Sequence, residues 1–478
     1  MVRIMKWNDY KLKKLKNPEF KKAYDELELK YSLINKKFVK MMNRREFIKK
    51  VIGGVFLLAS GNLFSGCGEI SDGDGMIYES TDKKISDLEI SNLRQLITSN
   101  ANETRCIMWQ TDALLKNPAV EIKSDATGDT YTFAALYCSF SDDDHINNQY
   151  SAKIEALHAD TSWQYRIVDG EHCTNWHTLR TTSGDTFKML IFPDSQCADY
   201  GVWNKVAKSA YARNEDAALF VNVGDIVDNG EDRTQWQAWF NGAAAFIDKI
   251  PFVPVMGNHE CYNRQWQTRL PEAYLKYFEV PDNGSDNFER RYYSFDYGDV
   301  HFAVLDSQWE ELNAVKDGAG DELIQAQQEW LRRDMSTTTK KWKVVFIHKD
   351  VLQYRINGRP ERREGFSDIG TAFMPLFDEL KIDIVFTAHL HTYRNRGNIY
   401  NFEHDSNGTL YILTGLAGDV RYSGLWVDHA LDLAKAPQPE TDNYLTLEVS
   451  SDKIYVKCFL PDGTEIDRTV VKQREQKT

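Results

Sequence analysis

The sequence lacks the features that mark several large classes of protein. It has 7 cysteines among 478 residues, and no two of them have the Cys-x-x-Cys spacing of common zinc sites. The net charge is −13 and no basic stripe is present, so the sequence predicts no nucleic-acid partner, because an acidic protein repels the phosphate backbone. The apolar run at residues 51–64 is shorter than the roughly 20 residues that span a bilayer. No internal repeat is found.

The composition is that of a globular protein with room for two or three domains. Hydrophobic residues make up 42% of the chain and charged residues 27%, which are ordinary values. The charge is uneven, because residues 1–66 are basic and the rest of the chain is strongly acidic. An acidic body of this kind repels a polyphosphate or nucleotide unless a local positive charge attracts it.

Five polar motifs each follow a short apolar run typical of a buried strand. The runs are residues 189–192, 219–223, 252–256, 344–347 and 384–386. The motifs are Asp194, Gly224-Asp225, Gly257-Asn258-His259-Glu260, His348 and His389-Leu390-His391. Such runs with helical stretches between them predict an α/β sheet, in which active sites lie at the carboxyl ends of the strands. Aspartate supplies charge, and histidine and asparagine supply neutral donors, so the set indicates a two-metal hydrolase site.

Together the motifs resemble the calcineurin-like metallophosphoesterase superfamily, and within it the purple acid phosphatase branch. The resemblance covers residues 92–471 and includes further blocks: Trp163-Gln164-Tyr165-Arg166, Tyr292-Tyr293-Ser294-Phe295-Asp296-Tyr297-Gly298, Gln328-Glu329-Trp330-Leu331 and His389-Leu390-His391-Thr392-Tyr393. It implies an α/β (α+β) four-layer sandwich over residues 186–471. An all-β sandwich, similar to a fibronectin type III domain, is expected before it at residues 85–183, where short β-prone runs alternate with turns.

The resemblance also implies a role for each motif residue. Asp225 is expected to bridge both metals. Asp194 and His391 are expected to bind the first metal, and the ligands of the second are expected to be Asn258, His348 and His389. His259 is expected to be the acid that donates a proton to the substrate, with Glu260 holding its far nitrogen. A metal-bridging hydroxide would then attack the phosphorus of a phosphate monoester.

Three positions depart from the family pattern. Asp228 stands where the purple branch has a tyrosine, so we expect no purple iron(III)–tyrosinate colour. Gln196 stands where the superfamily often has a histidine, and it is either a fifth ligand of the first metal or a hydrogen-bonding neighbour. Ala388 replaces a glycine. These changes leave the identity of the two divalent or mixed-valence ions open among manganese, zinc and iron.

The substrate-binding residues are predicted less directly. The loop at residues 351–370 carries four arginines, whose guanidinium groups match phosphate geometry, although a solvated surface loop is an equal interpretation. They are Arg355, Arg359, Arg362 and Arg363. Asn229, Tyr262 and Tyr393 are further candidates for the pocket. The alternatives to a phosphomonoesterase are a phosphodiesterase or nucleotide pyrophosphatase and, in another class, an inactive surface protein that binds a ligand through its β-sandwich.

The N-terminal region resembles an export signal. Residues 43–50 contain paired arginines similar to those of a twin-arginine signal, and residues 51–64 fit its apolar core. Phe64-Ser65-Gly66-Cys67 resembles a lipobox, in which Cys67 would be acylated. Residues 41–67 are thus expected to direct export to the periplasm or cell surface with a lipid anchor in the membrane, and residues 68–84 to form a linker. Residues 1–40 are expected to be a misassigned leader, with translation starting at Met41 or Met42.

Overall fold

The structure is a computed structural model that describes residues 84–155, 157–181, 184–437 and 441–473. The expected leader, twin-arginine segment, Cys67 and all of the linker except Lys84 lie outside the described residues, so their assignments stay predictions. No helix within the described ranges is long and apolar enough to cross a membrane. The six cysteines in those ranges are all free, so none of them is paired with another.

The N-terminal part of the described chain consists of strands. They are β1 (Ile85–Ser86), β2 (Ser91–Leu96), β3 (Arg105–Thr111), β4 (Pro118–Ser124), β5 (Thr130–Ala134), β6 (Leu136–Asp142), β7 (His145–Ile154), β8 (Ser162–Asp169), β9 (His172–Cys173) and β10 (His177–Arg180). Trp109 on β3 and Trp163 on β8 are buried in one core between the two sheets that these strands form. The likeness to fibronectin type III stays a prediction.

The remainder of the chain alternates strands with helices. The first set of strands is β11 (Phe187–Phe192), β12 (Leu219–Asn222), β13 (Phe252–Pro254), β24 (Tyr444–Val449), β25 (Lys453–Phe459) and β26 (Glu465–Lys472). The second set is β14 (Tyr293–Tyr297), β15 (Val300–Leu305), β16 (Trp342–Ile347), β19 (Ile384–Thr387), β20 (Tyr393–Tyr400), β21 (Glu403–His404), β22 (Thr409–Thr414) and β23 (Ala434–Lys435). The short strands β17 (Leu352–Gln353) and β18 (Gly365–Phe366) pair with each other.

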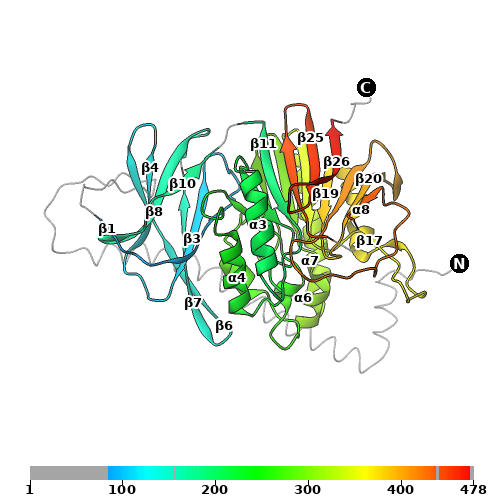
Figure 1. Cartoon of the computed structure of the whole chain (residues 1–478), viewed down its shortest axis with the longest axis horizontal. Coiled ribbons are helices and arrows are strands. Elements are labelled where there is room, and N and C mark those ends of the chain that lie inside the picture. The colour runs from blue at the N-terminus through cyan, green and yellow to red at the C-terminus, as the bar shows by residue number, and fades with distance from the viewer. Residues whose placement is uncertain (1–83, 156, 182–183, 438–440, 474–478) are drawn as a thin grey trace, which may run out of the picture. The chain divides into compact units, whose positions relative to one another are not determined.

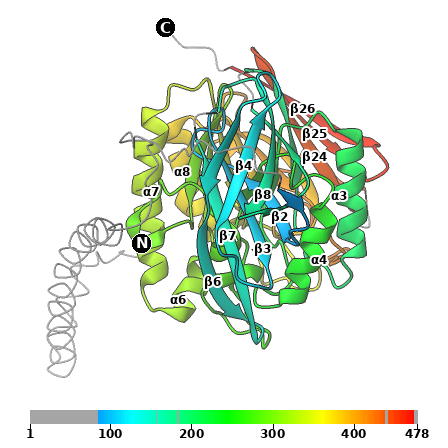
Figure 2. The same cartoon turned by 90° about the vertical axis from the view of Figure 1, so that its left-hand side faces the viewer.

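Six α-helices accompany these strands within the described residues. They are α3 (Gly201–Arg213), α4 (Arg233–Ala243), α5 (Glu272–Tyr277), α6 (Trp309–Val315), α7 (Ala319–Thr337) and α8 (Asp368–Leu380). Helix α4 begins where the Asp232 side chain accepts hydrogen bonds from the backbone N–H groups of Thr234 and Gln235. Figure 2 shows α3 and α4 on one side of the strands and α6, α7 and α8 on the other.

Alternation along the strands explains these layers. On β11, Phe192 packs against Trp203 of α3 with ring centroids 5.1 Å apart, while Phe187 packs against Tyr297 of β14 at 4.8 Å. On β16, Phe346 belongs to the core between the two sheets and Ile347 to the core under α7 and α8. Because successive side chains of a strand point to opposite faces, each sheet is buried on both faces. The expected four-layer α/β sandwich is therefore confirmed, as helix, sheet, sheet, helix (Figure 1).

The N-terminal strands and strands from the remainder of the chain share one sheet. Its order is β26-β25-β24-β11-β12-β13-β2-β3-β7-β6, and Phe252 of β13 pairs with Leu96 of β2. The division into two domains near residue 183 stays a prediction, and this pairing joins the two parts across it.

The strands that carry the motifs run parallel within each sheet. In the first sheet β11, β12 and β13 are parallel neighbours, and in the second β15, β16, β19 and β22 are. All five motif loops therefore leave carboxyl ends of parallel strands, and the Nδ1 of His348 lies 2.8 Å from the backbone oxygen of Val223 in the other sheet. The edges of both sheets meet at the motifs.

Candidate metal centre

Two groups of ligand atoms meet at Asp225. One group is Asp225, His348 and His389, and the other is Asp194, Asp225 and His391; within each group the candidate ligand atoms lie within 4.8 Å of one another. Asp225 is 1% exposed and is common to both groups. The loops therefore place one carboxylate between two sets of donors, as the sequence predicts.

On one side of Asp225 lie His348 and Asn258. The Nδ1–H of His348 donates to the backbone oxygen of Val223 at 2.8 Å, which leaves its Nε2 as the free donor atom. This Nε2 lies 3.1 Å from Oδ2 of Asp225 and 3.3 Å from Oδ1 of Asn258. The three side chains thus face a common point.

On the other side lie Asp194 and His391. The Nδ1–H of His391 donates to the backbone oxygen of Val420 at 2.6 Å, so that its Nε2 faces Oδ1 of Asp194 at 3.5 Å. The backbone N–H of His389 donates to both carboxylate oxygens of Asp194 at 3.0 Å. These backbone bonds hold the Asp194 carboxylate and the His391 ring in place.

Three of the ligand residues have left-handed backbone conformations. The φ angle is 44° at Asp225, 78° at His389 and 53° at His391. Residues with a Cβ atom adopt positive φ at a cost, and such strain is concentrated at functional sites. The sharp turns direct side chains from loops that lie far apart in sequence toward one centre.

The charges in the site are strongly coupled. Burial alone would lower the pKa of His348, but the Asp225 carboxylate raises it to about 9. Burial would raise the pKa of Asp225, but the charges of His348 and His259 keep it well below its usual value. Burial and the nearby His348 lower the pKa of His389 to about 3, so this imidazole is neutral and able to bind a cation.

The side chains fit two metal ions. Nδ1 of His389 and Oε1 of Gln196 are buried and have no hydrogen-bond partner, which is costly unless another group binds them. The candidate ligand atoms are carboxylate and amide oxygens and imidazole nitrogens, the set that suits manganese, zinc or iron. Gln196 remains either a ligand or a neighbour, since its Nε2 also lies 3.3 Å from Oδ1 of Asp228 and from Nε2 of His259.

His259 lies beside the centre, but its partner is not the one expected. Its Nε2 is 4.0 Å from Oδ2 of Asp225, and its Nδ1–H donates to the backbone oxygen of Asp228 at 2.7 Å. The expectation that Glu260 holds the far nitrogen of His259 was wrong. The Glu260 carboxylate is buried and accepts hydrogen bonds from the backbone N–H groups of Ile226, Val227 and Gly257 at 2.9, 3.2 and 2.7 Å.

Glu260 therefore stabilises the two ligand loops, and its removal is expected to lower stability. We expect Glu260→Ala to reduce the free energy of unfolding by about 3 kcal/mol or more, because three buried amide donors lose their acceptor. Urea denaturation measures this change, with Glu322→Ala on the exposed face of α7 as the matched control. An alanine variant of normal stability that has lost its activity would restore the catalytic role for Glu260.

The predicted substrate residues have different outcomes. Tyr393 is 1% exposed, belongs to the core, and donates its hydroxyl to Asp467 at 2.6 Å, so the prediction that it lines the pocket was wrong. Three of the four loop arginines are exposed, namely Arg355, Arg359 and Arg363. Arg362 is partly buried over the ring of Trp426 at 5.8 Å. A role of the arginines in substrate binding stays a prediction.

Aromatic residues that the motifs did not reveal surround the centre. Tyr422 stacks on His391 with ring centroids 4.7 Å apart and an interplanar angle of 21°. Trp266 and Tyr262 lie against His259 at 5.8 and 5.7 Å. Of these, Tyr262 was named in the sequence analysis as a candidate for the pocket. The sequence signal for Trp266 is a single large ring in a polar run soon after the His259 motif.

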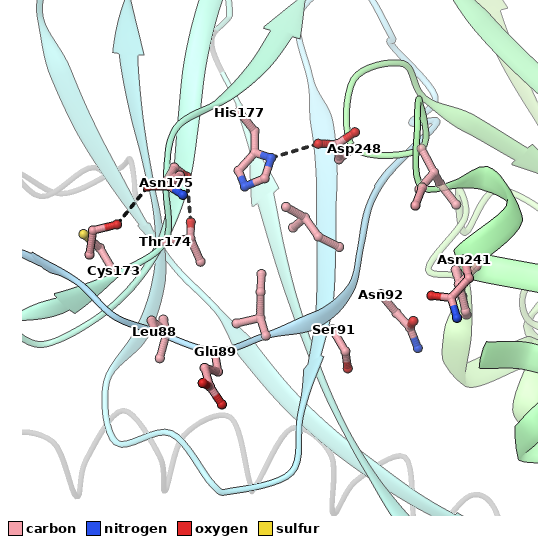
Figure 3. A pocket seen from close by; sticks show the side chains of 16 residues that line it. Leu88, Glu89, Ser91, Asn92, Cys173, Thr174, Asn175, His177, Asn241 and Asp248 are labelled. Carbon is pink, nitrogen blue, oxygen red and sulfur yellow. Dashed lines mark hydrogen bonds and ion pairs between the residues drawn. The ribbon is translucent and has the colours of Figure 1, made fainter. Parts of the chain in front are cut away.

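A separate cavity of about 620 Å³ lies between the N-terminal strands and the end of α4. Figure 3 shows its wall, in which His177 points toward Asp248, with Nδ1 2.9 Å from Oδ2. Asn175 and Asn241 add amide groups to the wall. None of the candidate ligand residues named above lines this cavity, so it is distinct from the candidate metal centre.

Comparison with known proteins adds independent findings. The family described as calcineurin-like phosphoesterase matches residues 172–393. Purple acid phosphatase 23 of Arabidopsis thaliana is 24% identical over 300 residues, which cover 56% of this chain and 62% of that protein. The match thus spans less than two thirds of that relative.

Two solved structures share the fold. The purple acid phosphatase PPD1 from yellow lupin (Lupinus luteus) seeds has a TM-score of 0.66 at 15% identity, covering 81% of this chain and 75% of that one. PhoD has a TM-score of 0.56 at 12% identity, covering 80% of this chain and 88% of that one. At these identities the likeness concerns the fold alone.

Proposed function

We propose that this chain, which is a purple acid phosphatase-like metallophosphoesterase and hence a hydrolase, cleaves phosphate monoesters at a centre of two metal ions. The observation that carries the proposal is the shared carboxylate of Asp225, buried between two groups of ligands that come from both sheets. Every residue of the expected ligand set carries a side chain that can bind a metal ion, which argues against an inactive site.

The residues around the centre support this chemistry. Bound cations would activate a water molecule and neutralise the charge that develops on the phosphoryl oxygens. His259 is oriented by the backbone oxygen of Asp228, so its Nε2 faces the centre and is placed to donate a proton to the leaving oxygen. Gln196, 3.3 Å from that Nε2, is placed to contact the same oxygen atoms.

Hydrolysis of p-nitrophenyl phosphate and of its bis ester tests the proposal. We expect protein loaded with manganese, zinc or iron to cleave the monoester faster than the bis ester. Chelation of the metal is expected to abolish the activity. Faster cleavage of the bis ester would favour the alternative of a phosphodiesterase or nucleotide pyrophosphatase. Lack of activity on both esters with every metal would refute the proposal.

The second candidate function is ligand binding through the N-terminal strands. It is favoured by the cavity beside His177 and Asp248, which combines amide, imidazole and carboxylate groups with apolar walls. This function requires no metal, so metal-free protein would have to bind the ligand with unchanged affinity. A ligand whose binding disappears on chelation would belong to the metal centre instead.

Export and lipid anchoring are proposed from the N-terminal motifs alone. The paired arginines before residue 46 and the lipobox-like sequence ending at Cys67 support them. Mass analysis of the mature protein tests both points: a chain that begins at an acylated Cys67 is expected, and a mature chain that retains residues 41–66 would refute the proposal.

A further inference from the structure

The loop that follows His259 exposes a tryptophan in a strained conformation. Trp266 is 57% exposed and has a φ of 60°, a left-handed backbone that bulky residues rarely adopt. An exposed indole ring and a strained backbone each lower stability, so their coincidence beside a catalytic histidine points to function.

The strained conformation is held by its neighbours. The side-chain oxygen of Asn263 accepts hydrogen bonds from the backbone N–H groups of Gln265 and Gln267 at 3.0 and 2.8 Å. The backbone N–H of Trp266 donates to the backbone oxygen of Asn263 at 2.8 Å, and the side chain of buried Asn229 donates to the same oxygen at 2.5 Å. These bonds hold the backbone of the loop in its left-handed conformation at Trp266.

The indole packs against the ring of His259. Its ring centroid lies 5.8 Å from that of His259 at an interplanar angle of 86°, so the edge of one ring meets the face of the other. Tyr262 adjoins both rings, at 5.7 Å from His259 and 6.1 Å from Trp266. The half-exposed indole thus lies beside the ring of His259, the residue proposed to donate a proton to the departing alcohol of a phosphate ester.

We propose that Trp266 stacks on a planar aromatic ring in the leaving group, so that the preferred substrates are aryl or nucleoside phosphates. The inference rests on the proposed function, because it places the phosphoryl group at the metal centre. Stacking of a base on an aromatic side chain gives a sizeable affinity without sequence-specific hydrogen bonds. A monophosphate suits a chain with a net charge of −13 better than a polyanion does.

Phosphonates that are not hydrolysed test the stack without relying on turnover. Phenylphosphonate, cyclohexylphosphonate and methylphosphonate carry the same head group, and calorimetry on the metal-loaded full chain gives the dissociation constant of each. We expect the phenyl compound to bind about 10-fold more tightly than the methyl compound, within the range that stacking on one ring gives. The cyclohexyl compound, which is apolar but not planar, is expected to fall close to the methyl compound.

The variants keep the loop folded while changing the ring. Trp266→Asn suits a left-handed backbone, and we expect it to bring the ratio of phenyl to methyl affinity to about twofold or less while methylphosphonate binding stays unchanged. Trp266→Phe is expected to keep most of the preference. The matched control is Trp176→Ala, since Trp176 is an exposed tryptophan between β9 and β10 whose ring lies under Arg166.

Each outcome decides the inference separately from the proposed function. An unchanged affinity ratio in Trp266→Asn overturns the stack even if the protein cleaves p-nitrophenyl phosphate. A reduced ratio supports the stack even if no ester is cleaved, in which case only the proposed hydrolysis fails. Equal losses of affinity for the phenyl and cyclohexyl compounds in Trp266→Asn would overturn the assignment of a planar substrate class. So would the absence of binding of any phosphonate.

Discussion

Asp225→Asn is expected to remove metal binding and with it nearly all hydrolysis of p-nitrophenyl phosphate. Asp225 is the one residue common to both ligand groups, so its loss weakens both sites together. We expect kcat/KM to fall by about a thousandfold, the upper end of the effect of removing one electrostatic group from an active site. Elemental analysis after dialysis and a phosphate-release assay measure the two effects.

The same variant is expected to leave the metal-free fold intact. Asparagine keeps the oxygen that accepts the backbone N–H of His259, a bond of 2.9 Å in the structure. It also removes the buried charge that raises the pKa of His348 to about 9, so that His348 becomes neutral at physiological pH. Added metal should therefore raise the thermal midpoint of the wild type but not that of the variant.

Asp216→Asn controls for the general loss of one negative charge, because Asp216 is an exposed carboxylate paired with Lys188. It is expected to bind metal and hydrolyse substrate as the wild type does. An Asp225→Asn variant that still retained two ions and full activity would contradict the shared-carboxylate arrangement.

The ligand set could be predicted because each ligand is tied to a local pattern. Asp194 follows β11, Asp225 follows β12 and His348 follows β16, and all three strands are apolar runs that are easy to recognise. Parallel pairing brings the carboxyl ends of β11 and β12 to one edge of the first sheet and those of β15 and β16 to one edge of the second. Packing of the two sheets against each other then brings these edges together, which local signals do not specify.

The predictions that were wrong depend on contacts made by backbone atoms and on the directions in which side chains point. The partner of His259 is the carbonyl oxygen of Asp228, and a carbonyl oxygen leaves no trace in the residue type. Glu260 was assigned to His259 by the family resemblance, yet successive side chains of a 3₁₀ helix such as His259–Cys261 point in different directions. The pairing of β13 with β2 was not predicted. The sequence indicates where each strand begins and ends, but it does not show which strands become neighbours in a sheet.

Gly224→Ala is expected to displace His348 and so to disrupt the metal centre by sterics alone. A Cβ atom on Gly224 would lie 2.6 Å from Cγ of His348, too close for the ring to keep its place. The ring is held there by the bond from its Nδ1–H to Val223, which directs Nε2 toward Asp225. Losing that orientation is expected to weaken metal affinity by about 100-fold, the upper range for disturbed support of a ligand.

Gly128→Ala separates this clash from backbone strain. Gly128 has a φ of 78°, close to the 89° of Gly224, but no atom lies within 4 Å of its Cβ position. Both variants carry the cost of a left-handed alanine, about 1–2 kcal/mol of unfolding free energy, so this loss should appear in both denaturation curves. Only Gly224→Ala should also lose metal, and excess metal should restore part of its activity. The opposite result is that both variants bind metal as tightly as the wild type does. That result would show that the His348 ring can move without loss of metal affinity, and it would contradict the fixed orientation of His348 as a ligand of the second metal.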